Sequence, residues 1–214
     1  MKIKAIIFDY DGVIVDSFPT IHKVYQIICK KLGKKCPEKF PEFKKFFGYN
    51  SRNFIKNLGL TEEETRKFDE FCSEEILNQE PKFFHKIDDV IKKLKEKYKL
   101  IIVSSNTQRE VENKMKLLGV HSHFNIIMGG KVGPLKKSTA FKELIKDLNL
   151  SEDEILVVGD RVNDYFDAKE AGLNNIILVE YGWGYEKEKI PNHKQSIIVK
   201  KPLDLIKAVE SFEK

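Results

Sequence analysis

Six short apolar runs, rich in β-branched residues, recur along the chain and constrain its fold more than any other feature. Most of these runs are continuous rather than alternating, as expected of strands that are buried on both faces of a parallel sheet. Segments with helical periodicity lie between them, for example residues 107–119 and 136–150. This alternation predicts an α/β fold with a doubly wound, mainly parallel sheet. The predicted strands are residues 4–8, 100–104, 124–128, 154–159, 175–179 and 196–199.

The interval of residues 16–84 breaks this alternation. It holds no convincing strand, only helical patterns that proline and glycine residues interrupt. Its clearest helix follows Thr61, which forms a capping-box pattern with Glu64. We therefore expect an inserted helical domain. The predicted domains are an α/β core of residues 1–15 and 85–214 and the helical insertion of residues 16–84.

The composition excludes several classes of protein. The chain has 214 residues, of which 41% are hydrophobic, so it can bury a sizeable core. Its apolar runs are far too short to cross a bilayer, and its N-terminus lacks a signal-peptide pattern. Three cysteines without CxxC spacing argue against a disulfide framework and a zinc ribbon. The net charge is +5, but the basic residues are scattered among 33 acidic ones. We expect a cytoplasmic protein that binds neither nucleic acid nor membranes.

Two carboxylates, Asp9 and Asp11, directly follow the first predicted strand in the stretch FDYDG. Side chains two residues apart on extended backbone point the same way, so these two should project together. Gly12 then permits a tight turn. Two carboxylates so close repel each other, and either a cation or a retained proton relieves the repulsion. By itself, however, this pattern is more often an ordinary turn at the end of a strand.

A second acidic site, Asp160 and Asp164, follows the fourth predicted strand. The carboxyl ends of parallel strands meet at one edge of the sheet, so Asp160 should lie near Asp9. Oxygen ligands from two strand ends, with water completing the sphere, suit Mg²⁺. Asp164 has three open roles, as a partner of Asp160, of a neighbouring backbone group or of a metal-bound water. Alone, this second pattern also fits a capped helix with acids in its first turn.

Two weaker signals occur at the same predicted edge. The second strand ends in Ser104, Ser105 and Asn106, where a hydroxyl and the N–H groups of the next helix are placed to bind an anion. Lys136 and Lys137 stand just ahead of a helix, where an ammonium offsets phosphate and carboxylate charge. Serine is common after strands and lysine is abundant in this chain. Neither signal therefore decides anything by itself.

The order of the four motifs says more than any one of them. With h for an apolar residue, the chain reads hhhhDxDG, hhhSSN, lysine before a helix, and hhhhGDxxxD. This order resembles the haloacid dehalogenase-like superfamily, in its phosphoglycolate phosphatase and β-phosphoglucomutase-like branch with a small helical cap. The agreement continues into DGVIVDS and EAGLNNIILVEYGWG and covers the α/β part nearly end to end. The resemblance implies that the helical insertion is such a cap.

The resemblance also implies a mechanism and a set of functional residues. The chain would be a Mg²⁺-dependent phosphatase that acts on a small phosphorylated metabolite. Asp9 would attack phosphorus and form an aspartyl-phosphate, while Asp11 would protonate the leaving oxygen and later activate water. The metal would be held by Asp9, the backbone carbonyl of Asp11 and Asp160, with Asp164 in support.

Two choices within this scheme stay open. Ser104 would hold a phosphoryl oxygen, and it is preferred to Ser105 because it directly ends the apolar run. Lys137 would offset the charge of phosphate and carboxylates, and its spacing to Phe141 favours it narrowly over Lys136.

Substrate contacts are harder to place. The stretch FFGYNSRNFIKNLGL resembles the cap loop that faces the substrate, which makes Arg52 a candidate contact to an anionic substrate. An exposed arginine on a helix is the more common role for such a residue. Asn106 is a second candidate contact.

Three other functions compete with the phosphatase. A sugar phosphomutase of the same superfamily would return the phosphoryl group to a bisphosphate intermediate. A non-catalytic phospho-acceptor, as in signalling receiver domains, shares the acidic pocket, but such domains are shorter, lack the insertion and carry the acceptor on a later strand. A binding module without turnover is the third. Dehalogenases attack carbon and do not need an acid two residues on, so Asp11 favours phosphate-ester chemistry. Monomer and homodimer are both open.

Overall fold

The computed structural model of the chain describes residues 2–48, 51–77, 79–131, 135–190 and 196–213. It divides into two compact units. The α/β unit consists of residues 1–16 and 81–214, and the helical unit consists of residues 17–80.

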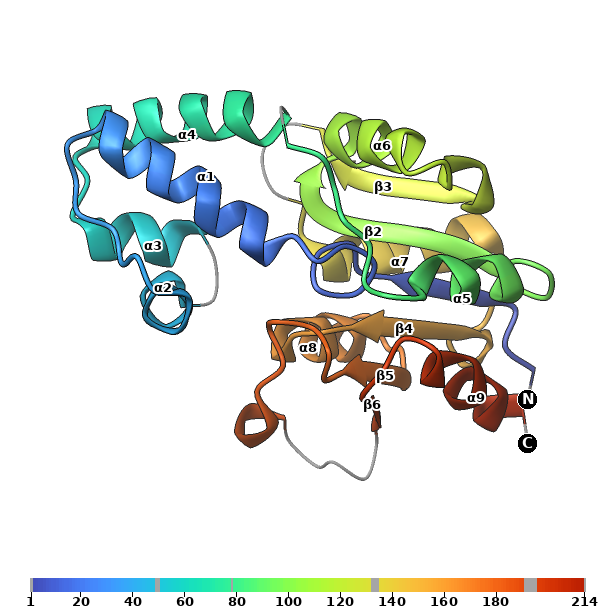
Figure 1. Cartoon of the computed structure of the whole chain (residues 1–214). Coiled ribbons are helices and arrows are strands. Elements are labelled where there is room, and N and C mark those ends of the chain that lie inside the picture. Colours follow the sequence, from blue (N-terminus) through green and yellow to red (C-terminus); the bar gives the residue numbers. More distant parts are fainter. Residues whose placement is uncertain (1, 49–50, 78, 132–134, 191–195, 214) are drawn as a thin grey trace. The chain divides into compact units, whose positions relative to one another are not determined.

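The α/β unit is built on one sheet in which all six predicted strands are present (Figure 1). Their order is β3-β2-β1-β4-β5-β6, and every neighbouring pair is parallel, so the predicted fold class is confirmed. One strand is longer than predicted, because β2 continues three residues beyond Ser104 to Thr107, which pairs with Gly130 after a register shift. The strands are β1 (Ala5–Phe8), β2 (Lys99–Thr107), β3 (Ile126–Gly130), β4 (Ile155–Gly159), β5 (Asn175–Val179) and β6 (Ser196–Val199).

Helices cover both faces of this sheet. Ile6 and Phe8 of β1 pack into one apolar cluster with α5, α6 and α9, whereas Ala5 and Ile7 pack into a second cluster with α7 and α8. Both faces are therefore dry, which explains why the strands read as continuous apolar runs. The helices are α5 (Ile87–Leu94), α6 (Gln108–Leu117), α7 (Lys137–Leu148), α8 (Val162–Glu170) and α9 (Asp204–Glu210), with short 3₁₀ helices η1 (His121–His123), η2 (Glu152–Glu154), η3 (Lys187–Lys189) and η4 (Ser211–Glu213).

The strand order places two acidic segments next to each other. The chain runs outward from β1 through β2 to β3, then crosses to β4 on the other side of β1. Connections from β1 and β4 thus leave in opposite directions, and in open α/β sheets such a switch point is where ligands bind. Phe8 pairs with Val158, so Asp9 and the residues after Gly159 emerge together at the carboxyl edge.

The helical unit is stabilised by an aromatic core. Phe43, Phe54 and Phe68 are all buried, and the ring of Tyr25 lies 4.7 Å from that of Phe54 and 4.9 Å from that of Phe68, measured between centroids. The predicted capping box is present, because the backbone N–H of Glu64 donates to Thr61 Oγ1 and that of Thr61 donates to Glu64 Oε2. The helices are α1 (Phe18–Lys31), α2 (Phe40–Phe47), α3 (Ser51–Leu58) and α4 (Glu62–Leu77).

The helical unit is shorter than the predicted insertion of residues 16–84. Residues 81–84 belong with the α/β unit because backbone hydrogen bonds tie them to the segment after β1. The N–H of Asp16 donates to the carbonyl of Lys82 at 2.9 Å, and that of Phe84 donates to the carbonyl of Ile14 at 3.2 Å. Two short extended segments, too brief for a sequence pattern to reveal, therefore close the base of the insertion.

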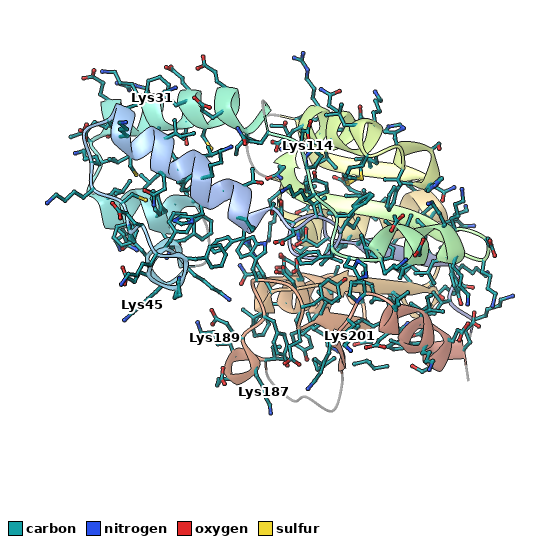
Figure 2. All side chains as sticks on the ribbon, viewed as in Figure 1. Lys31, Lys45, Lys114, Lys187, Lys189 and Lys201 are labelled. Atoms are coloured by element: carbon teal, nitrogen blue, oxygen red, sulfur yellow. The ribbon has the colours of Figure 1, made fainter. Side chains whose placement is uncertain are left out.

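Charged side chains are spread over the surface of each unit. Figure 2 labels lysines on several separate elements, among them Lys31 on α1, Lys45 on α2 and Lys201 after β6. Lys31 is paired with Glu75 at 2.7 Å. No helix in the described ranges is long and apolar enough to cross a membrane.

The aromatic core makes a prediction about stability. Replacing the fully buried Phe43 by alanine should cost about 3–5 kcal/mol through lost burial and a cavity. Phe40, on the same helix, is 41% exposed, so Phe40→Ala should cost far less. Urea denaturation followed by circular dichroism measures both variants. Equal losses for the two would contradict the packing described for this unit.

Candidate active site

A buried ion-pair cluster lies at the carboxyl edge of β1 and β4. Lys137, the first residue of α7, places its Nζ 2.7 Å from Asp9 Oδ1 and 2.6 Å from Asp164 Oδ1. All three residues are at least nine-tenths buried. Charges withdrawn from water this far are stable only when they are paired and hydrogen-bonded. Each member of the cluster therefore depends on the others.

Asp164 holds the turn that follows β4. Its Oδ2 accepts the backbone N–H groups of Asp160, at 3.1 Å, and of Arg161, at 3.0 Å. Its Oδ1 accepts from Lys137. Both oxygens of Asp164 are thus occupied by protein donors. Asp164 therefore binds the backbone of Asp160 and also the neighbouring backbone of Arg161. Its role toward a metal-bound water stays a prediction.

Asp160 is fully buried, and only one of its two carboxylate oxygens accepts a hydrogen bond from the described residues. Its Oδ2 accepts the backbone N–H of Gly184 at 2.7 Å. Its Oδ1 has no hydrogen-bond partner among the described residues, and Arg161 Nε stands 3.8 Å away. Gly12 lets the segment after β1 lie directly against Asp160. Its φ is +80°, and a Cβ there would lie 2.1 Å from Asp160 Oδ2.

The carboxylates fit a divalent cation. Asp9, Asp160 and Asp164 each offer an oxygen within 4.8 Å of the others. A buried carboxylate oxygen without a hydrogen-bond donor, as in Asp160, is unfavourable unless a cation approaches it. Asp9 also has an oxygen to spare, since Tyr10 N–H and Lys137 both contact its Oδ1. Asp9 and Asp160 would therefore be the better direct ligands, and Asp164 would support them.

The pKa values of the buried carboxyl groups also favour a bound cation. Burial raises the pKa of Asp9 to about 7; Lys137 opposes this shift, and the like charges of Asp164 and Asp11 add to it. Burial likewise raises the pKa of Asp160 to about 8, against the opposing effect of Arg161. Burial alone would lower the pKa of Lys137, but Asp164 and Asp9 raise it overall. With all three carboxylates ionised, the cluster carries more negative than positive charge, and a bound cation would favour the ionised form of Asp9 and Asp160.

Asp11 belongs to a second, less buried group of polar residues. Its Oδ2 accepts from Asn106 Nδ2 at 2.8 Å, and the backbone N–H of Asn106 donates to Ser104 Oγ at 3.1 Å. Ser104 is buried, whereas Ser105 points to the exposed side of the same strand. The sequence had suggested Asn106 as a substrate contact. In the structure Asn106 donates a hydrogen bond to Asp11, 95 residues away along the chain, and no local sequence pattern predicts this pairing.

The remaining predicted residues lie outside these two groups. Lys136 is on the surface and pairs with Glu170 at 2.9 Å. Arg52 is exposed on α3 of the helical unit and pairs with Asp69 at 3.2 Å. Sequence reasoning missed the backbone of Gly184 as a partner of Asp160. The only signal for it was the pair of glycines in YGWG after the fifth predicted strand.

Comparison with known proteins identifies the family. A family model described as haloacid dehalogenase-like hydrolase matches residues 6–178, most of the chain. The chain belongs to this family. A phosphoglycolate phosphatase from Synechococcus elongatus is 25% identical over 216 residues, covering 96% of this chain and 97% of its own. Another from Aquifex aeolicus is 26% identical over 217 residues, covering 97% of each chain.

Solved structures agree with this assignment at the level of the fold. A haloacid dehalogenase-like hydrolase from Streptococcus pneumoniae gives a TM-score of 0.82 at 24% identity, covering 96% of this chain and 97% of that one. The predicted family and fold are thus confirmed, and so is the prediction of a hydrolase.

The two adjacent lysines make a direct test of this geometry. Lys137→Ala leaves Asp9 and Asp164 buried without their cation, which should cost about 3–5 kcal/mol in the metal-free protein. It should also lower turnover by about 100-fold or more, because a charge aimed at the reacting groups is lost. Lys136→Ala removes only a surface pair and should change neither property. If Lys136→Ala proved the worse lesion, the arrangement around Asp9 would be wrong.

The raised pKa of Asp160 predicts that the metal-free protein becomes less stable as the pH rises. Between pH 4 and about 8 the folded state holds a proton that the unfolded chain releases, so the metal-free protein should lose stability as the pH rises through this window. Asp160→Asn removes that cost and should raise the thermal midpoint at pH 8 in the presence of a chelator. The same variant should no longer be stabilised by Mg²⁺. A lower midpoint in chelator would contradict this account.

Proposed function

We propose that this protein is a Mg²⁺-dependent phosphatase that hydrolyses a small phosphorylated metabolite through an aspartyl-phosphate on Asp9. One observation carries the proposal. Two carboxylates that are two residues apart in sequence, Asp9 and Asp11, have different partners and can therefore have different roles. Asp9 is buried against the ammonium of Lys137, and Asp11 is half-buried against the neutral amide of Asn106.

Asp9 is suited to be the nucleophile. Tyr10 N–H and Lys137 Nζ both contact its Oδ1 at 2.7 Å, and no described residue donates a hydrogen bond to its Oδ2. We infer that one carboxylate oxygen of Asp9 forms the new bond to phosphorus while the bond from phosphorus to the leaving oxygen breaks, and that the other oxygen would face the cation. Lys137 fixes the orientation of the carboxylate and offsets charge in a site with little water.

Asp11 is suited to be the acid and base. The neutral amide of Asn106 orients Asp11 without adding charge, and in the proposed mechanism Asp11 begins with a proton. That proton passes to the leaving oxygen in the first step. In the second step Asp11 takes a proton from water as the water attacks phosphorus, the bond to Asp9 breaks, and inorganic phosphate leaves.

The cation and Ser104 complete the proposed site. Mg²⁺, held by Asp9 and Asp160 with Asp164 in support, would supply positive charge against the phosphoryl oxygens. Ser104 is the buried hydroxyl beside Asn106, and we propose that it donates to a phosphoryl oxygen. Ser105 faces away and has a weaker claim.

Relatives support a small substrate. Two relatives that match the chain over nearly its full length are named phosphoglycolate phosphatases. We therefore place phosphoglycolate first among the candidates. The helical unit as a substrate cap, Arg52 as a contact to an anionic group and a cytoplasmic location stay predictions, and so does a monomeric or homodimeric state.

The test is phosphate release with a nucleophile variant. Wild type and Asp9→Asn are compared on phosphoglycolate, sugar phosphates, nucleotides and p-nitrophenyl phosphate, with Mg²⁺ or with chelator. We expect Mg²⁺-dependent release by wild type and a loss of at least about four orders of magnitude in Asp9→Asn, because the attacking oxygen is gone. Asp147→Asn, at an exposed position of α7, is the matched control and should behave as wild type.

The contrary outcomes separate the competing functions. Release that persists in Asp9→Asn would remove Asp9 as nucleophile. Slow net release that accelerates when a sugar bisphosphate is added would indicate a phosphomutase. A wild type that neither releases phosphate nor becomes phosphorylated would indicate a binding role.

A further inference from the structure

The loop that follows β5 joins the two acidic segments of the site. This YGWG loop comprises Tyr181, Gly182, Trp183 and Gly184. The hydroxyl of Tyr181 donates to the carbonyl of Val13 at 3.0 Å, on the segment after β1. The backbone N–H of Gly184 donates to Asp160 Oδ2, on the segment after β4. The loop is thus anchored to both strand ends that carry the carboxylates.

The loop lies against Asp160 without any space between them. A Cβ on Gly182 would lie 2.4 Å from Asp160 Cβ, and one on Gly184 would lie 2.8 Å from Asp160 Oδ2. Real side chains do not approach this closely. The bare backbone of the loop therefore fixes one oxygen of Asp160 and leaves only the other, Oδ1, to face a ligand.

Trp183, the residue between these two glycines, contacts the side chain of Arg161. The guanidinium carbon of Arg161 lies 3.9 Å from the centre of the Trp183 ring, a stacked cation–π contact. In this position Arg161 Nε stands 3.8 Å from Asp160 Oδ1, beyond hydrogen-bond distance. A shift of about 0.9 Å would bring the two atoms to the usual N–H···O separation. With Arg161 stacked on the ring, the two groups form only a loose ion pair, and Asp160 Oδ1 accepts no hydrogen bond from a described residue.

We propose that Trp183 is a positioning residue for the cation site: it holds the Arg161 guanidinium against its ring and so keeps Asp160 Oδ1 available to Mg²⁺. This proposal rests on the proposed function, which takes Asp160 as a ligand. Without the ring, Arg161 closes onto Oδ1, and Mg²⁺ must displace a charge-assisted hydrogen bond in order to bind. Trp183 thereby acts on metal affinity through Arg161 and does not itself touch the ion.

Mg²⁺ binding measured by titration calorimetry on the full chain tests the proposal without relying on turnover. Trp183→Ala should weaken binding by about 10-fold, the scale typical for loss of a group that orients a metal ligand. Trp183→Phe keeps an aromatic face for the guanidinium and should bind nearly as wild type. Trp183→Leu keeps apolar volume without that face, so it should bind as weakly as the alanine variant and serves if Trp183→Ala fails to fold.

The decisive comparison places the same change in an Arg161→Ala background. If Trp183 acts by holding Arg161, then Trp183→Leu should not weaken Mg²⁺ binding further once Arg161 is gone. Equal weakening in both backgrounds would mean that the ring merely packs the loop, and it would overturn the proposal. So would unchanged affinity of both the alanine and leucine variants beside a wild type that binds. A folded wild type that binds no Mg²⁺ would overturn the proposed cation site and this inference together. Thermal unfolding in chelator verifies that each variant is folded.

Discussion

The buried ammonium of Lys137, placed between the carboxylates of Asp9 and Asp164, is the interaction on which the rest of the site depends. Three carboxylates from two neighbouring strand ends would otherwise repel one another in a dry environment. Lys137 offsets part of that charge and leaves a remainder. When the acids are ionised this remainder is negative and lies at the switch point of the sheet, where it would attract a cation.

The four aspartates of the site have different hydrogen-bond and ion-pair partners. Asp164 uses both oxygens on protein donors and so stabilises the turn. Asp160 uses one oxygen on Gly184 and keeps the other free. Asp9 is oriented by the ammonium of Lys137, and Asp11 is oriented by the side-chain amide of Asn106. These four aspartates therefore differ in their hydrogen-bond donors although they are the same residue type.

Much of the fold and part of the site were predictable from the sequence. Strands buried on both faces give unbroken apolar runs, so all six were found, and their carboxyl ends gave Asp9 and Asp160. Ser104 could be favoured over Ser105 because it directly ends the apolar run, and Lys137 narrowly over Lys136 because of its spacing to Phe141. Long-range partners could not be found this way. The bond from Asn106 to Asp11, the N–H of Gly184 and the closure of the insertion by residues 81–84 all depend on how distant segments meet.

Phosphorylation of Asp9 can be detected by chemical trapping of the proposed intermediate. Wild-type protein is mixed with Mg²⁺ and the best substrate of the phosphate-release panel, quenched during turnover and reduced with borohydride, which converts an aspartyl-phosphate to homoserine. Peptide mass spectrometry then locates the modified residue. We expect homoserine at position 9 that depends on both substrate and Mg²⁺. Homoserine at Asp160 or another acid, with Asp9 unchanged, would contradict the proposed role of Asp9.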